Sequence, residues 1–371
     1  MAKFKYYDIR RILEEYPNAY YYLIIGERSN GKTYSALSYA LERYFKHGEQ
    51  FAYLRRWGED IRKKQLSNLF SGHVENHLIE KLSNGEWLGV DYTGSKFRLT
   101  KADEDGKVIY SDDPIGFAFD LNSMEHFKSI SFPKITTVIF DEFLSRQSYL
   151  PNEFMLFTNA LSTIVRLRTN VKIFMLGNTV NKYCPYFAEM GLTHIKEQKQ
   201  GTIDQYKYAA SGLEVVVEYC ESSNKRGGKG SDVYFAFDNP QLQMITQGSW
   251  EIAIYPHLPE RYKPKEVVAQ FFIDFDKELL HGEVISKSNC APFVFLHRKT
   301  TEIKSDDDIV YGQRPDANPY HRVGLRAYTD KLTKFIRQCY AENRIFYSEN
   351  EVGEIFRNYL LWADNENIKR R

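Results

Sequence analysis

Eight consecutive residues near the amino terminus have the types and order of a phosphate-binding loop. They match the pattern G-x-x-x-x-G-K-[ST] in full: Gly26, Glu27, Arg28, Ser29, Asn30, Gly31, Lys32 and Thr33. In such a loop the glycines let backbone N–H groups turn toward phosphate oxygens, the lysine reaches the β- and γ-phosphates, and the threonine hydroxyl ligates Mg²⁺. We therefore expect ATP at this loop, with Lys32 on the phosphates and Thr33 on Mg²⁺. A plain glycine-rich turn is the alternative.

Two adjacent acids, Asp141 and Glu142, follow the apolar segment VIF at 138–140. An apolar strand that ends in such a pair is the Walker B arrangement. Asp141 would hold Mg²⁺, directly or through water, and Glu142 would polarise the attacking water. The pair favours NTP hydrolysis by the additional-strand class of P-loop ATPases over a kinase or a Ras-like GTPase. Two acids that merely cap a buried strand are the alternative.

Further polar residues are placed where they could contact a nucleotide. Asn178 closes the next apolar run and would sense the γ-phosphate, although asparagine after a strand is commonly a turn residue. Arg28, inside the loop, would contact the γ-phosphate of its own subunit. Arg166 and Arg168 end a predicted helix and would project onto a neighbouring subunit's nucleotide as an arginine finger. The alternative is that they stand there only because the helix dipole favours positive charge at the carboxyl-terminal end of a helix.

Basic residues gather in two further places. The first group follows a predicted strand near Trp57: Arg55, Arg56, Arg62, Lys63 and Lys64. The second lies in a glycine-rich loop: Lys225, Arg226 and Lys229. Both groups could meet a phosphate backbone, and a solvated surface is the alternative for both.

The elements that must position these residues alternate between strands and helices. The predicted elements are a strand at 20–26, a helix at 32–46, strands at 50–57 and 135–141, a helix at 152–168 and a strand at 171–178. Short, continuously apolar strands are typical of a parallel sheet that is covered on both faces. Turn signals within 58–134 predict a helix and one or two β-hairpins inserted into or beside that sheet. We therefore predict an α/β fold.

Composition places the domain boundaries. A length of 371 residues predicts about two domains. We expect a P-loop domain over 1–205, a linker or lid region over 206–263 with a mobile loop at 221–231, and a carboxyl-terminal domain over 264–371 that ends in two amphipathic helices. The apolar stripes of these helices are expected to be core: Leu325, Tyr328, Leu332, Phe335, Ile336 and Cys339 in the first, and Ile355, Phe356, Tyr359 and Leu360 in the second.

Overall composition narrows the class of protein. Hydrophobic residues make up 43% and charged residues 27%, which is typical of a globular chain. Fifty Lys and Arg oppose 49 Asp and Glu, so any nucleic-acid contact must rely on locally clustered charge. The four cysteines are widely spaced, which argues against a disulfide framework and fits a reducing cytoplasm. No window of 18 apolar residues occurs, so we expect no membrane span.

These motifs together resemble a specific family, the DNA-packaging (encapsidation) ATPases of small phi29-like tailed phages, relatives of the large terminase subunits. The resemblance covers about residues 15–190, and the matching segments occur in the same order: GERSNGKT, GEQFAYLRRW at 48–57, TTVIFDEF at 136–143, YLPNEF at 149–154, the Arg166-containing helix end and LGNTVNKYCPYF at 176–187. Beyond residue 200 the resemblance rests mainly on length and order.

The resemblance implies a homo-oligomeric, pentameric ring motor that acts at the portal vertex of an empty prohead in the host cytoplasm and is absent from the mature virion. It would use ATP and Mg²⁺ to translocate double-stranded DNA through the portal. Arg166 matches the trans-acting arginine finger, with Arg168 as the fallback, Lys128 matches a further trans-acting basic residue, and Arg28 matches the arginine of terminase-type loops. A structural packaging RNA on the prohead is a further implied partner.

The resemblance also implies an RNase H-like carboxyl-terminal domain. A nuclease would require three separated acids that converge on two metal ions. The sequence offers one pair, Asp274 and Asp276, and one solvent-type acidic run at 306–308, so we expect a vestigial nuclease that binds DNA or RNA. Two other functions remain open: a hexameric helicase-type ATPase, and a nucleotide-dependent assembly switch without translocation.

Overall fold

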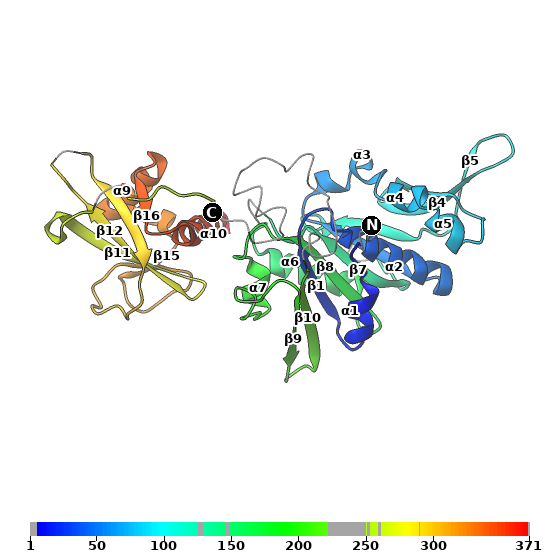
Figure 1. Cartoon of the computed structure of the whole chain (residues 1–371), viewed down its shortest axis with the longest axis horizontal. Coiled ribbons are helices and arrows are strands. Elements are labelled where there is room, and N and C mark those ends of the chain that lie inside the picture. Colours follow the sequence, from blue (N-terminus) through cyan, green and yellow to red (C-terminus); the bar gives the residue numbers. More distant parts are fainter. Residues whose placement is uncertain are drawn as a thin grey trace, which may run out of the picture. The chain divides into compact units, whose positions relative to one another are not determined.

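The computed structural model describes residues 6–124, 130–145, 149–221, 250, 253–258, 261–288 and 290–369, except for the side chains of residues 326 and 365–369. The chain forms two compact units, Met1–Glu251 and Ile252–Arg371. Figure 1 shows both, the first in blue to green and the second in yellow to red. None of the described helices combines the length and apolar character needed to cross a lipid bilayer.

The first unit is built on one ten-stranded sheet with the order β3-β4-β6-β2-β7-β8-β1-β10-β9, and β5 pairs with β4. The strands are β1 (Tyr21–Gly26), β2 (Gln50–Arg55), β3 (Gly89–Thr93), β4 (Lys96–Ala102), β5 (Val108–Tyr110), β6 (Gly116–Asp120), β7 (Ile135–Asp141), β8 (Lys172–Asn178), β9 (Thr202–Tyr208) and β10 (Leu213–Tyr219). The run from β6 to β10 is parallel throughout. Strand β8 lies between the phosphate-loop strand β1 and the acid-bearing strand β7, which is the inserted strand that defines the additional-strand class.

Helices cover both faces of this sheet, as the continuously apolar strands predict. Strand β7 is buried at every position. Its alternate residues face two different cores, so that Val138 and Phe140 pack with α6 and α7, whereas Ile139 packs with α2. The helices of the unit are α1 (Arg10–Glu15), α2 (Lys32–His47), α3 (Lys63–Leu66), α4 (Ser71–Glu75), α5 (Leu78–Leu82), α6 (Glu153–Ile164) and α7 (Pro185–Glu189).

The insertion predicted for 58–134 joins the same sheet rather than forming a separate body. Strands β3, β4 and β5 form antiparallel hairpins, and β4 pairs with β6, which lies beside β2. Three short helices, α3 to α5, precede them where a single helix was predicted. The insertion therefore widens the sheet on the side away from β1.

The boundary of the first unit differs from the expected residue 205. Strand β10 pairs in parallel with β1 through Tyr21–Val215 and its neighbours, and β9 pairs with β10. Residues 202–219 are therefore part of the same sheet, because their backbone hydrogen bonds complete its edge. Of the predicted mobile loop at 221–231, only Glu221 lies within the described residues.

The second unit contains a six-stranded sheet with the order β15-β14-β11-β12-β13-β16. Its strands are β11 (Val267–Phe275), β12 (Glu278–Ile285), β13 (Phe293–Arg298), β14 (Val310–Gly312), β15 (His321–Val323) and β16 (Ile345–Tyr347). The first three are antiparallel, and β14 and β15 follow on the other side of β11 in parallel. A sixth strand, β16, pairs in parallel with β13 at the opposite edge of the sheet.

The two predicted carboxyl-terminal helices are α9 (Lys331–Ala341) and α10 (Asn350–Lys369). Helix α9 begins later than its predicted stripe because the Asp330 side chain accepts a hydrogen bond from Thr333 N and caps the helix there. Leu325, the first residue of the stripe, lies in a 3₁₀ turn instead. Ile336, Cys339, Ile355, Phe356 and Tyr359 are buried, so the stripes are core as expected.

Candidate nucleotide-binding and hydrolysis site

The phosphate-binding loop joins β1 to α2 and adopts the backbone that its glycines permit. Gly31 has a φ of 95°, a left-handed conformation that glycine adopts at little cost. The Lys32 ammonium is buried and donates to Glu27 O at 2.7 Å and to Asn178 Oδ1 at 3.3 Å. Strands β1 and β8 are in register at Gly26 and Asn178, which brings the asparagine to the lysine. The residue predicted as a sensor therefore contacts the lysine that is predicted to bind phosphate.

The two residues predicted to hold Mg²⁺ are in direct contact. Thr33 Oγ1 donates to Asp141 Oδ1 and Oδ2 at 3.2 and 3.1 Å, and Tyr53 donates from its hydroxyl to Asp141 Oδ2 at 2.9 Å. Burial raises the pKa of Asp141 above its ordinary value, against the opposing effects of the Arg55 charge and the Tyr53 hydrogen bond. A hydroxyl and one carboxylate suit Mg²⁺ in NTP sites, where phosphates and water complete the oxygen ligands. The residues present therefore fit the ion, which would neutralise charge on the phosphates.

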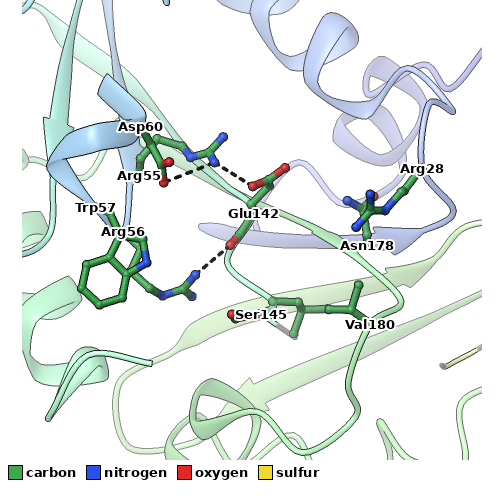
Figure 2. A pocket seen from close by; sticks show the side chains of 10 residues that line it. Arg28, Arg55, Arg56, Trp57, Asp60, Glu142, Ser145, Asn178 and Val180 are labelled. Atoms are coloured by element: carbon green, nitrogen blue, oxygen red, sulfur yellow. Dashed lines mark hydrogen bonds and ion pairs between the residues drawn. The ribbon is translucent and has the colours of Figure 1, made fainter. Parts of the chain in front are cut away.

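Glu142 is paired with an arginine from the neighbouring strand. Arg55 Nη2 lies 2.6 Å from Glu142 Oε2 and 3.4 Å from Asp60 Oδ2, and Figure 2 shows the guanidinium between the two carboxylates. Glu142 itself has a left-handed backbone, with a φ of 56°. The sequence predicted the glutamate but neither of these partners. The register of β2 with β7 decides the contact, and no local pattern reveals that register.

Arg56 has a different environment from the one expected of a DNA contact. Its side chain is buried and forms an ion pair with Glu153, with Arg56 Nε 2.7 Å from Glu153 Oε2. Its remaining nitrogens donate to the carbonyl oxygens of Glu142 and Phe143 at 3.2 and 2.7 Å. The prediction that Arg56 presents a nucleic-acid surface is therefore wrong, because its guanidinium is buried. For Arg55, whose side chain is 18% exposed, a nucleic-acid contact stays a prediction.

The phosphate-binding loop, the acid pair and Asn178 surround one cavity of about 400 Å³. It is lined by Arg28, Ser29, Asn30, Gly31, Lys32, Thr33, Tyr34, Asp141, Glu142, Leu176, Gly177 and Asn178. A second cavity of about 290 Å³ shares Arg28, Glu142 and Asn178 with the first and adds Arg55, Arg56, Trp57 and Asp60 to its lining. Figure 2 shows this second cavity. The exposed Arg28 thus lines both cavities, as a group that reaches the γ-phosphate would require.

The segment before β1 closes over the phosphate loop. Tyr7 N donates to Asn30 O at 2.9 Å, and the buried Tyr7 hydroxyl donates to Glu218 at 2.7 Å. A Cβ placed on Gly31 would lie 3.2 Å from Tyr6 Cβ, so the Tyr6 side chain packs directly on the loop. Sequence patterns did not identify these contacts, since residues 6 and 7 lie outside any motif.

The two candidate finger arginines differ in their contacts. Arg166 is exposed, has a φ of 54° and donates to Ile130 O at 3.0 Å. Arg168 is half-buried and donates to five carbonyl oxygens: those of Phe132, Pro133, Ile135, Ile164 and Val165. Arg168 therefore connects the end of α6 to the segment before β7, and Arg166 is the more exposed of the two arginines.

The remaining basic candidates are only partly described. Lys63 and Lys64 are exposed on α3, where Lys63 Nζ lies 3.5 Å from Asp91 Oδ2. Arg62 is exposed and pairs with Glu59 at 3.1 Å. Four further candidates lie outside the described residues: Lys128, Lys225, Arg226 and Lys229.

Comparison with known proteins shows that this chain is similar to phage DNA packaging proteins. The DNA packaging protein of Bacillus phage B103 is 33% identical over 172 residues, which are 46% of this chain and 47% of that protein. The chain thus matches about half the length of the curated relatives. The solved structure of the Phi-28 gp11 DNA packaging motor is 20% identical, with a TM-score of 0.54 over 97% of this chain and 98% of its own. The bacteriophage Phi-29 viral genome packaging motor assembly is 21% identical, with a TM-score of 0.53 over 95% and 99%.

Both structural likenesses show the fold, which extends across both units of the chain. The family assignment comes from the sequence of the first unit, where the phosphate loop, the acid pair and the asparagine all lie. The model of the Podovirus DNA encapsidation protein (Gp16) family matches residues 1–201, and this chain therefore belongs to that family.

Proposed function

We propose that this chain is an ATP-driven motor subunit that hydrolyses ATP and translocates double-stranded DNA into the prohead. One observation carries the proposal: Lys32, Thr33, Asp141, Glu142 and Asn178 come from three adjacent strand ends and face a single cavity. Lys32 would bind the phosphates and Thr33 with Asp141 would hold Mg²⁺. Glu142 would orient the attacking water once its carboxylate turns from Arg55 into the cavity.

The site needs a second subunit in this proposal. Within the described residues of the cavity lining, Arg28 and Lys32 are the cations that can approach phosphate oxygens. Arg166 projects from the end of α6 and would complete a neighbour's site, which implies a ring of like subunits, a pentamer by family resemblance. Lys128 is the further candidate for such a contact. Lys63 and Lys64, with the loop residues Lys225, Arg226 and Lys229, would provide weak contacts to DNA.

The second unit would bind nucleic acid without cutting it. Strand β14, which pairs with β11 beside Asp274, carries Val310, Tyr311 and Gly312 and therefore offers no carboxylate to share a metal ion. A two-metal nuclease requires acids from several elements around one centre. We propose that the motor acts in the host cytoplasm at the portal of the prohead. Its partners there would be double-stranded DNA, the portal and a packaging RNA.

Hydrolysis of ATP by the purified protein tests the proposal, measured with and without double-stranded DNA for the wild type, Glu142→Gln and Arg166→Ala. We expect wild-type hydrolysis to increase with protein concentration, and both variants to lose hydrolysis while they still bind ATP. Arg62→Ala, which removes an exposed arginine outside both cavities, should hydrolyse ATP as the wild type does. If no hydrolysis occurs at any concentration with DNA, the chain is not a motor on its own: it either needs its portal or binds the nucleotide as an assembly switch.

A further inference from the structure

A buried ion pair contacts the loop that carries Glu142, and both of its partners make further hydrogen bonds. The Arg56 and Glu153 side chains are 6% and 0% exposed, and Arg56 Nε lies 2.7 Å from Glu153 Oε2. Glu153 also accepts from the Tyr186 hydroxyl at 2.9 Å and from Leu150 N at 2.7 Å. Removing two charges from water is costly, so a pair of this kind is weak evidence for stability alone. Its contacts indicate a different role.

Arg56 holds the backbone of the residue that carries the proposed base. The two terminal nitrogens of the guanidinium span Glu142 O and Phe143 O, at 3.2 and 2.7 Å. Glu142 has a φ of 56°, a left-handed backbone that is uncommon for residues other than glycine and persists only when its surroundings support it. The rigid guanidinium fork therefore stabilises the backbone conformation that orients the Glu142 carboxylate.

Glu153 connects Arg56 to the helix that precedes Arg166, the proposed trans-acting arginine. It is the first residue of α6, a helix of 12 residues, and Arg166 follows the end of that helix by two residues. At about 1.5 Å per residue the helix transmits a displacement over about 18 Å as a rigid rod. Any shift of the Glu142 loop that moves Arg56 is thus passed to the helix that carries Arg166.

We infer that Arg56 and Glu153 are positioning residues that couple two sites of the ring: they hold Glu142 over the subunit's own nucleotide and set the helix that presents Arg166 to the neighbour's nucleotide. This inference rests on the proposed function, because it takes Arg166 to act on a neighbouring subunit. The alternative is that the pair only stabilises the fold, in which case its replacement would change stability and leave both sites unchanged.

An apolar replacement of the pair separates these roles. Arg56→Met combined with Glu153→Leu removes both charges together, and such replacements of buried pairs are often neutral or stabilising. We nevertheless expect the double variant to melt below the wild-type temperature but to stay folded at the assay temperature, because Glu142 O, Phe143 O, Leu150 N and the Tyr186 hydroxyl lose their partners. Its KM for ATP should stay within about twofold of wild type, because Lys32 and Thr33 are unchanged. Its kcat should fall about 100-fold, the effect of displacing a reacting group by about 1 Å.

Mixed rings test the connection to Arg166. An Arg166→Ala subunit keeps its own Glu142, and a Glu142→Gln subunit still presents Arg166 to its neighbour. A site is complete only where the first kind of subunit holds the nucleotide and the second kind donates Arg166. An equal mixture of these inactive variants should therefore recover about a quarter of wild-type hydrolysis. This mixture is the control. In the test mixture, the Arg56→Met, Glu153→Leu double variant takes the place of the Glu142→Gln variant as the subunit that donates Arg166. This mixture should stay inactive, because Arg166 of the double variant is displaced.

Complementation by the double variant at the control level would overturn the inference, and so would a wild-type kcat in the double variant alone. An inactive control mixture would instead show that the shared site of the proposed function is wrong. If the double variant does not fold, Arg56→Lys replaces it in both assays, because lysine keeps a positive charge beside Glu153 but cannot span two carbonyl oxygens. The same two outcomes then decide the inference.

Discussion

The guanidinium of Arg55 lies 2.6 Å from the carboxylate of Glu142, although 87 positions separate the two residues in the chain. The contact arises because β2 and β7 are adjacent parallel strands, so their carboxyl ends deliver both side chains to one edge of the sheet. The Glu142 side chain is 56% exposed and its partner 18%. Asp60, at 3.4 Å, is placed to keep the arginine paired when Glu142 turns toward the nucleotide.

Removing the Arg55 charge should release the glutamate. An ion pair with a half-exposed partner contributes about 0.2–1 kcal/mol, so Arg55→Gln should raise DNA-independent kcat by up to about fivefold, with little change in the KM for ATP. Steady-state hydrolysis without DNA measures both constants.

Arg62→Gln is the matched control for that measurement. Arg62 lies seven positions further along the chain, is 66% exposed and pairs with Glu59 rather than with Glu142. Its kcat should equal the wild-type value. A fall in kcat for Arg55→Gln would mean that Arg55 assists hydrolysis instead of restraining it.

Alanine variants of Arg166 and Arg168 should differ in their effects, with Arg166→Ala reducing ATP hydrolysis and Arg168→Ala reducing the free energy of unfolding. Arg168→Ala removes a side-chain donor from five carbonyl oxygens, of which Phe132 O and Val165 O keep a backbone donor, so we expect a loss of about 1–3 kcal/mol in the free energy of unfolding, from the cost of unmet hydrogen bonds. Arg166→Ala loses a single exposed contact and should unfold as the wild type does while its ATP hydrolysis is lost. Urea unfolding and hydrolysis are measured on both variants. Equal unfolding free energies for the two variants would contradict the structural role given to Arg168.

Gly177 allows the loop after Glu142 to approach β8 closely. A Cβ at this position would lie 2.8 Å from Leu144 Cδ1 and from Phe143 Cε1, closer than real Cβ contacts. Gly177→Ala should therefore cost about 1–3 kcal/mol by overpacking and lower kcat more than it alters the KM. Gly312→Ala, where the nearest atom would be 3.8 Å away, is the control and should change neither quantity. A wild-type kcat in Gly177→Ala would show that the loop tolerates the displacement.

His73 should make the unfolding free energy depend on pH. Its ring is stacked on Tyr34 with centroids 4.1 Å apart, and burial lowers its pKa to about 4 from an ordinary value near 6.5. Between these two values the unfolded chain binds more protons than the folded one, so stability rises with pH there and is lost as pH falls from about 6.5 to about 4. The contribution lost between pH 7 and pH 5 is about 2 kcal/mol.

Urea unfolding at pH 7 and pH 5 checks this expectation. In His73→Gln the difference between the two pH values should be smaller by that amount, because glutamine does not titrate. His77→Gln, which changes an exposed histidine four residues along, should keep the wild-type difference. An unchanged difference in His73→Gln would assign the pH dependence to other groups.

Local chemistry made much of the first unit predictable from the sequence. The phosphate loop, strand β7 at 135–141 and the acid pair that ends it were predicted with their observed bounds, because each depends on residue types within a few positions. The parallel sheet followed from continuously apolar strands, and the buried stripes of α9 and α10 followed from helical periodicity. Backbone conformation and burial of short segments are set largely by neighbouring residues, so sequence patterns report them well.

Only the tertiary structure decided which side chains meet at the site. Arg55 and Arg56 belong to a basic segment that is equally compatible with a DNA surface, and the pairing of β2 with β7 places them on Glu142 and on its carbonyl group. Because β10 pairs with β1, the first unit extends beyond residue 205. The left-handed turn at Arg166, after α6, gives Arg166 and Arg168 different contacts. Such contacts join residues far apart in the chain. Their geometry depends on how whole strands and helices pack, which no local pattern contains.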